Sequence, residues 1–138
     1  MSDIAVVTDS TADLPAALLA RYPIAMVPLV VNWDGQTFRD KLDLTTQDFY
    51  VRLRASKSLP KTGAPSIAAF EAEFRRQLEH HGAVVSVNVA SRLSGTYDIA
   101  RRAAQSEHQH CSCEVGCPTR TTASANEPSC IRRWSRLH

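Results

Sequence analysis

The segment from residue 91 to residue 97, Ser-Arg-Leu-Ser-Gly-Thr-Tyr, contains the residue types best suited to binding a ligand. It lies between an apolar run typical of a strand and a predicted helix, so hydroxyls and backbone N–H groups meet where the helix begins. A helix start binds anions because its first N–H groups lack partners and carry partial positive charge. Gly95 lets a ligand approach the backbone closely. The alternative is that Ser94 only caps the helix.

A second hydroxyl lies in the segment from residue 61 to residue 66, which is predicted to be a loop. Thr62 presents this hydroxyl shortly before a helix that Ser66 is expected to cap. A binding role for Thr62 is one interpretation. The other is that Ser66 is an ordinary cap and Thr62 has no function in binding.

Two carboxylates, Asp9 and Asp13, follow the first predicted strand in the segment from residue 8 to residue 13. Carboxylates in such a place can hold a metal ion or exchange protons. The interpretation that we favour is structural. Asp13 caps the next helix, and Asp9 accepts hydrogen bonds within its own loop.

Short apolar runs alternate with amphipathic segments along the chain, which predicts an α/β fold with a mostly parallel sheet flanked by helices. Strands are expected at residues 4–7, 24–31, 36–39 and 83–89, and helices at 13–22, 47–55, 67–81 and 95–104. Pro28 interrupts the second strand, which is therefore expected to be bulged or at an edge. Parallel sheets bind ligands beyond the carboxyl ends of their strands. The three polar loops are therefore expected to share one rim.

The composition is that of a single domain with a core, because 43% of the 138 residues are hydrophobic. Residues 1–105 are predicted to form the α/β domain. The net charge of +2 gives no strong attraction to nucleic acid or anionic membranes. No apolar run approaches the roughly 20 residues of a membrane span. The first residues lack the basic and apolar parts of a signal peptide, so we expect a cytoplasmic protein.

Residues 106–138 differ in composition from the preceding part. All four cysteines lie there, at positions 111, 113, 117 and 130, and large apolar residues are few. This segment is predicted to be an irregular, disordered tail without a core of its own. Its cysteines and histidines lack the paired spacing of structural zinc sites, so no metal site is predicted.

The three polar loops together resemble the motifs of the DegV family. Residues 8–14 match a T-D-S-[TS]-x-D-[LI] pattern, residues 62–66 resemble a T-S-Q-P-S-like loop, and residues 91–97 match S-[KR]-L-S-G-T-[YF]. The motifs occur in the family's order at plausible spacing. The resemblance covers about residues 4–105.

The resemblance implies a fatty-acid-binding protein with two domains, and not an enzyme. The acyl chain of a long-chain fatty acid would lie in an apolar tunnel between the domains. Thr62 and Ser94 would bind its carboxylate, and Gly95 would contribute a backbone N–H. A fatty acid kinase is implied as a partner that receives the bound carboxylate. No catalytic residue, metal or cofactor is implied.

Two features depart from the family's pattern. Gly63 and Ala64 replace the usual Ser-Gln pair, and the chain has about half the family's length. The resemblance implies a further strand and more helices after Ala104, whereas the sequence there looks out of register, so we expect a frameshift or a truncated gene model. Two other functions remain open. One is an enzyme on a related scaffold, which would need a base near Ser94. The other is a non-functional fragment with an exposed apolar face.

Overall fold

The structure is a computed structural model that describes residues 4–106, 113–114 and 131–132. Its strands are β1 (Ile4–Asp9), β2 (Ile24–Val27), β3 (Val30–Trp33), β4 (Gln36–Arg39), β5 (Lys61–Gly63), β6 (Ala83–Asn88), β7 (Cys113–Glu114) and β8 (Ile131–Arg132). Its helices are the 3-10 turn η1 (Ser10–Ala12) and the α-helices α1 (Ala16–Arg21), α2 (Thr46–Ala55), α3 (Ile67–Leu78) and α4 (Thr96–Ser106). The other residues of the predicted tail lie outside the described ranges, as do most of its cysteines and histidines.

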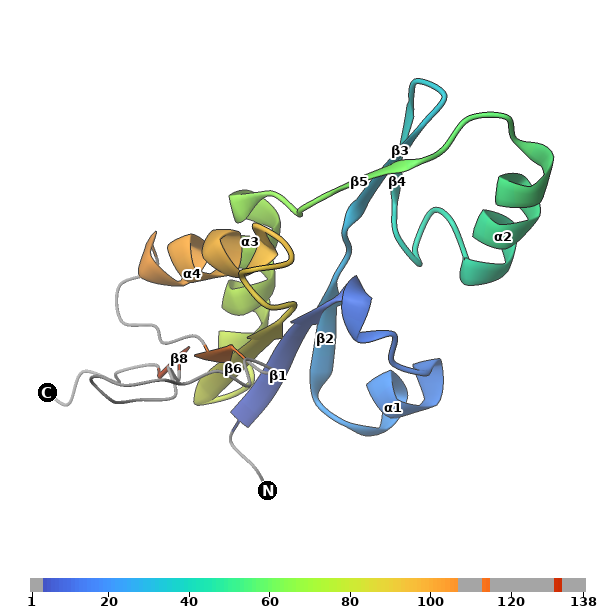
Figure 1. Ribbon diagram of the computed structural model, residues 1–138. Coiled ribbons are helices and arrows are strands. Elements are labelled where there is room, and N and C mark those ends of the chain that lie inside the picture. Colours follow the sequence, from blue (N-terminus) through green and yellow to red (C-terminus); the bar gives the residue numbers. More distant parts are fainter. Residues whose placement is uncertain (1–3, 107–112, 115–130, 133–138) are drawn as a thin grey trace, which may run out of the picture.

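The main sheet is parallel in the order β2-β1-β6-β7, and β8 pairs antiparallel with β6. Figure 1 shows α3 and α4 together over one side of this sheet, whereas α1 lies beside β2. This arrangement confirms the predicted α/β fold with a parallel sheet flanked by helices. Within the described residues, no helix is long and apolar enough to cross a membrane.

The main core lies between the parallel sheet and the α3–α4 pair. Phe70 and Phe74, one helical turn apart on α3, are fully buried against the strands. The α4 face of this core is made of small residues, which lets the helix pack closely. The buried members of the cluster are Ala5, Val7, Ala25, Val27, Phe70, Phe74, Val84, Ala100, Ala103 and Ala104.

A second sheet, antiparallel in the order β4-β3-β5, corrects the prediction of one strand over residues 24–31. The chain leaves β2 at Pro28-Leu29 and enters β3 in the other sheet (Figure 1). Pro28 cannot donate a ladder hydrogen bond, so the parallel strand ends there, and β2 is an edge strand as expected. Asp34 and Gly35 form the β3–β4 turn with φ values of 52° and 76°, as such two-residue hairpins require.

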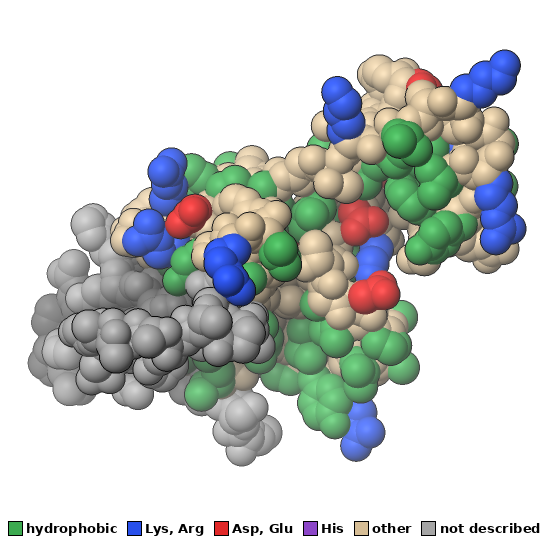
Figure 2. Space-filling model, viewed as in Figure 1, with side chains coloured by type: hydrophobic (Ala, Val, Ile, Leu, Met, Phe, Trp, Pro, Cys, Tyr) green, Lys and Arg blue, Asp and Glu red, His purple; other side chains and the backbone are tan. Residues whose placement is uncertain are grey.

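Helix α2 and the antiparallel sheet enclose a second, smaller core around Trp33. Thr45 caps α2 by accepting the Asp48 N–H at 3.1 Å, and Phe49 contacts Trp33 edge-on with ring centroids 5.4 Å apart. Tyr50, the next residue on α2, is exposed. Figure 2 shows exposed hydrophobic side chains in two places on this face of the molecule, over the antiparallel sheet and near α1.

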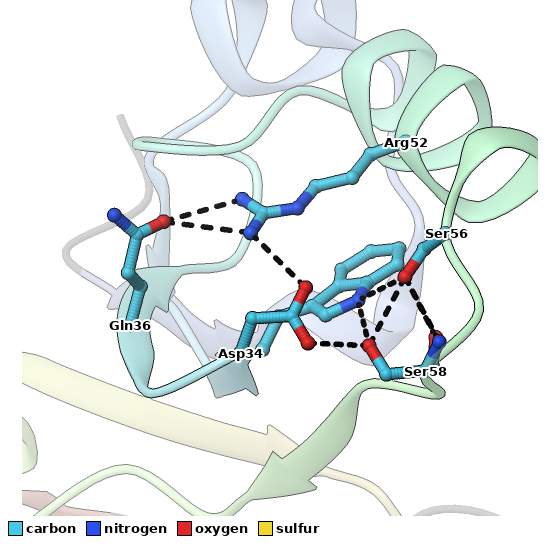
Figure 3. Close-up of polar contacts among 6 residues, drawn as sticks. Asp34, Gln36, Arg52, Ser56 and Ser58 are labelled. Carbon is cyan, nitrogen blue, oxygen red and sulfur yellow. Dashed lines mark hydrogen bonds and ion pairs between the residues drawn. The ribbon is translucent and has the colours of Figure 1, made fainter.

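A polar network ties the loop before β5 to the β3–β4 hairpin. The indole Nε1–H of Trp33 lies 3.2 Å from both the Ser56 and Ser58 hydroxyl oxygens, and Ser58 donates to Asp34. Figure 3 shows these serines pointing toward Asp34, with Arg52 reaching toward Asp34 and Gln36 from the other side. The network therefore fixes the residues that lead into β5.

Asp43 gives the fold a pH-dependent contact at the end of β4. Arg39 donates to this carboxylate from Nε (2.9 Å), Nη2 (2.8 Å) and its backbone N–H (2.8 Å). These hydrogen bonds lower the pKa of Asp43 from 3.8 to about 2. Because the folded pKa is depressed, the stabilisation is present above about pH 4 and is lost as the pH falls toward about 2.

We therefore expect Asp43→Asn to flatten the pH dependence of the unfolding free energy between about pH 4 and about pH 2. Denaturant titrations at several pH values measure this. Arg39→Gln, which removes the other partner, should flatten the same interval. The effect is small because both side chains are exposed. An unchanged slope in both variants would show that this pair does not form in solution.

Candidate anion-binding site

Asp9 ends β1 as a buried carboxylate whose oxygens are both occupied. Its Oδ1 accepts the N–H (2.9 Å) and the hydroxyl of Thr11, and its Oδ2 accepts the Val89 N–H at 2.8 Å. The side chain is only 1% exposed. This confirms the interpretation that Asp9 accepts hydrogen bonds in its own loop, and adds a contact with the end of β6.

Asp13 does not cap a helix, so that prediction is wrong. It has a left-handed φ of 52° and ends η1, and α1 begins after Pro15 without a side-chain cap. The Asp13 carboxylate is exposed and forms an ion pair with Lys41, which also has a positive φ. The hydrogen bond and charge of Lys41 lower the pKa of Asp13. Asp9 and Asp13 thus have separate partners, and the described part of the chain contains no cluster of three or more potential metal ligands.

Ser94, Gly95 and Thr96 form a compact start to α4. The Gly95 carbonyl accepts the Ile99 N–H at 3.1 Å, which makes Gly95 the residue from which the helix hydrogen bonds begin. The Ser94 hydroxyl oxygen accepts the Thr96 N–H at 3.2 Å and lies 2.9 Å from the Thr96 hydroxyl. Gly95 therefore occupies the N-cap position in place of Ser94, and Ser94 accepts the N–H of the first helical residue from one position earlier.

The Ser94 hydroxyl can still donate a hydrogen bond of its own while it accepts the Thr96 N–H. Thr96 is fully buried, and its hydroxyl is close enough to donate to the Ser94 oxygen. When it does, Ser94 accepts two hydrogen bonds and keeps its own proton for a ligand. Ser94 is half-buried and Gly95 is exposed, so a ligand can reach both. The sequence analysis missed the contact between Thr96 and Ser94, although the sequence shows a hydroxyl two residues after Ser94.

Gly95 has space in front of its Cα atom. A Cβ added there would meet no atom within 4 Å, and the residue does not have a positive φ. The fold itself therefore does not require glycine at this position. The opening agrees with the close approach of a ligand predicted from the sequence.

Thr62 lies in β5, which corrects the prediction that residues 61–66 are all loop. Strand β5 pairs antiparallel with β3, and Thr62 lies opposite Val31. The side chain is exposed. Ser66 caps α3 by accepting the Ala69 N–H at 3.1 Å, as predicted.

The expected common rim is divided between two sheets. The Asp9–Val89 hydrogen bond brings the first and third polar segments together at the carboxyl ends of β1 and β6. Thr62 belongs to the antiparallel sheet, and three residues separate its strand from α3, which packs against α4. The histidines of the described region, His80 and His81, precede β6 and so lie toward its opposite end from Ser94.

The fold and this site define a class of α/β protein with a partly open, hydroxyl-bearing helix start beside its parallel sheet. Residues 3–113 match the family model described as "Uncharacterised protein, DegV family". The chain belongs to the DegV family.

Relatives and solved structures agree with this assignment. A DegV domain-containing protein of Deinococcus radiodurans is 41% identical over 102 residues, which cover 74% of this chain and 36% of the relative. A fatty-acid-binding DegV family protein from Thermus thermophilus has a TM-score of 0.71 at 36% identity, covering 81% of this chain and 40% of that one. DegV of Bacillus subtilis, described as a fatty acid binding protein, has a TM-score of 0.72 at 33% identity, covering 77% of this chain and 38% of that one. The chain thus spans well under half the length of these proteins.

Proposed function

We propose that this chain binds a long-chain fatty acid by its carboxylate, with Thr62, Ser94 and Gly95 as the carboxylate-binding residues. The observation that carries the proposal is the start of α4, where the Ser94 hydroxyl lies 2.9 Å from the Thr96 hydroxyl and beside an open glycine. When Thr96 donates in this contact, Ser94 has a proton to donate to a ligand. The fatty acids bound by the Thermus and Bacillus proteins support the choice of ligand.

The chemistry of the site suits a carboxylate that stays ionised and accessible. Hydroxyl donors and the partial positive charge of a helix start stabilise an anion without covering it with a counter-ion. Asp98 in the first turn of α4 is exposed and lies near Arg101, with 3.6 Å between their charged atoms. A carboxylate held in this way can act as an acceptor for phosphoryl transfer. We also propose that the chain presents its bound fatty acid to a fatty acid kinase and that it is located in the cytoplasm.

Binding without catalysis is the second element of the proposal. A hydrolytic or acid–base mechanism needs a proton acceptor at the nucleophile. The group next to the Ser94 hydroxyl is the hydroxyl of Thr96, which is not a base. The described histidines lie toward the other end of β6. These features favour a carrier over an enzyme acting on a small phosphate or keto compound.

The test is lipid extraction from the chain purified from a bacterial host, with mass spectrometry of the extract. We expect near-stoichiometric fatty acid in the wild type and at least about tenfold less in a Thr62→Ala, Ser94→Ala double variant, because two charge-assisted hydrogen bonds are lost.

The matched control is the double variant Thr37→Ala, Thr45→Ala. It removes one strand threonine of the antiparallel sheet and one hydroxyl that bonds an N–H at a helix start, which costs about 1 kcal/mol, as the loss of the Ser94 hydroxyl does. Its bound lipid should equal that of the wild type. A folded wild-type chain without lipid would contradict the proposed function.

A further inference from the structure

Two neighbouring side chains at the end of β1 accept hydrogen bonds from the segments that lead to the two halves of the proposed site. Asp9 and Ser10 are each 1% exposed, so neither presents a group to solvent. The sequence singled out this segment for its carboxylates, yet the proposed carboxylate-binding residues do not include it. The hydrogen bonds of Asp9 and Ser10 point to a different role.

Asp9 holds the segment that carries Ser94 and Gly95. Its Oδ2 accepts the N–H of Val89, the first residue after β6, at 2.8 Å. From there the chain folds into a compact turn, in which the N–H groups of Leu93 and Ser94 both donate to the Ala90 carbonyl, at 2.8 and 3.2 Å. Because the turn is internally bonded, a shift of Val89 moves Ser94 and Gly95 with it.

Ser10 holds the antiparallel sheet that carries Thr62. Its hydroxyl oxygen accepts the Leu29 N–H at 3.1 Å, and the Leu29 carbonyl accepts the Asp40 N–H at 2.9 Å. Leu29 is the last residue of the link between the two sheets. Strand β3 begins at the next residue, and its Val31 is the partner of Thr62.

The two halves of the site therefore lie in different parts of the fold, joined along the chain by the short link before β3 and by residues 64–66 after β5. Both halves are also anchored at the end of β1. Hydrogen-bond donors to one carboxylate must keep their relative positions within about 0.5 Å to act together. We propose that Asp9 and Ser10 are positioning residues of the anion site, with Asp9 fixing Ser94 and Gly95, and Ser10 fixing Thr62. This inference rests on the proposed function and assigns a role to residues outside it.

A double-mutant cycle on fatty acid affinity tests the pairing. Ser10→Ala should weaken binding about fivefold to tenfold in the wild type and in Ser94→Ala, but less than about twofold in Thr62→Ala, because the residue it positions is already gone. Asp9→Asn keeps the shape of the side chain and loses one acceptor. It should show the reverse pattern, with its full effect in Thr62→Ala and a smaller effect in Ser94→Ala, where only the Gly95 N–H is left to be positioned.

A merely structural role gives a different result. Val84→Ala opens a cavity in the core of the parallel sheet and does not change Asp9 or Ser10. Its effect on affinity should therefore be equal in the wild type, Ser94→Ala and Thr62→Ala. If Ser10→Ala and Asp9→Asn also act equally in all backgrounds, the positioning role is overturned. Should Ser10→Ala fail to fold, Ser10→Cys, which keeps a weak acceptor of similar size, should give the same pattern with a smaller amplitude.

A geometric measurement separates this inference from the proposed function. Residual dipolar couplings report the orientation of β3 and β5 relative to β1 and β6 in the lipid-free chain. We expect this orientation to change in Ser10→Ala and to be unchanged in Val84→Ala. A wild type without lipid would overturn the fatty acid function alone, whereas an unchanged orientation in Ser10→Ala would overturn the positioning role.

Discussion

Replacing Gly95 by alanine is expected to reduce bound fatty acid at least about tenfold while leaving the fold intact. The added methyl meets no protein atom within 4 Å, and the backbone does not have a positive φ, so stability should change by less than about 0.5 kcal/mol. The methyl would instead occupy the space through which a carboxylate approaches the start of α4. Lipid mass spectrometry and thermal unfolding of the same preparation measure both quantities.

Gly35→Ala is the matched control for this prediction. A Cβ at Gly35 also meets nothing within 4 Å, but the residue has a φ of 76°. Alanine there should cost about 1–2 kcal/mol of stability and leave the bound lipid unchanged. The two variants are thus expected to give opposite results. Gly95→Ala should lose bound lipid and keep its stability, whereas Gly35→Ala should lose stability and keep its bound lipid. Full lipid content in Gly95→Ala would show that the ligand does not approach this backbone.

Local patterns predicted the helices and the parallel strands well, because each depends on contacts close in the chain. The recurrence of Phe70 and Phe74 after a capping serine identified α3, and the apolar run ending before Ala90 identified β6. The capping role of Ser66 was likewise visible, because an N-cap bonds within its own turn. The resemblance to the family then connected two of the three polar segments, those of Thr62 and Ser94, into one expected site.

The division of the site between two sheets could not be predicted in the same way. The link at Pro28-Leu29 looked like an interruption within one strand, because both sides of it have apolar, β-branched residues. Whether such a run continues in one sheet or enters another depends on pairing partners distant in the sequence. Strand β5 was missed for the same reason, since Lys61–Gly63 becomes a strand only through its pairing with β3.

Replacing Trp33 by alanine is expected to cost about 3–5 kcal/mol of stability, the largest effect of any change considered. Trp33 is 1% exposed, contacts Phe49, and lies beneath the Arg52 guanidinium, which is 5.1 Å from the ring centroid. Its cluster is separate from the core of the parallel sheet. Hydrogen exchange should therefore show β3 and β4 losing protection while β1 and β6 keep theirs.

The same variant connects stability with binding, because the Trp33 indole holds the serines that precede β5. Without it Thr62 loses its fixed position, and fatty acid affinity should fall toward that of Thr62→Ala. Leu59→Ala is the control in the same loop. That side chain is 82% exposed, so stability should change by less than about 0.5 kcal/mol. If β1 and β6 lose protection together with β3 in Trp33→Ala, the two cores unfold as one cooperative unit, and the antiparallel sheet cannot move independently of the start of α4.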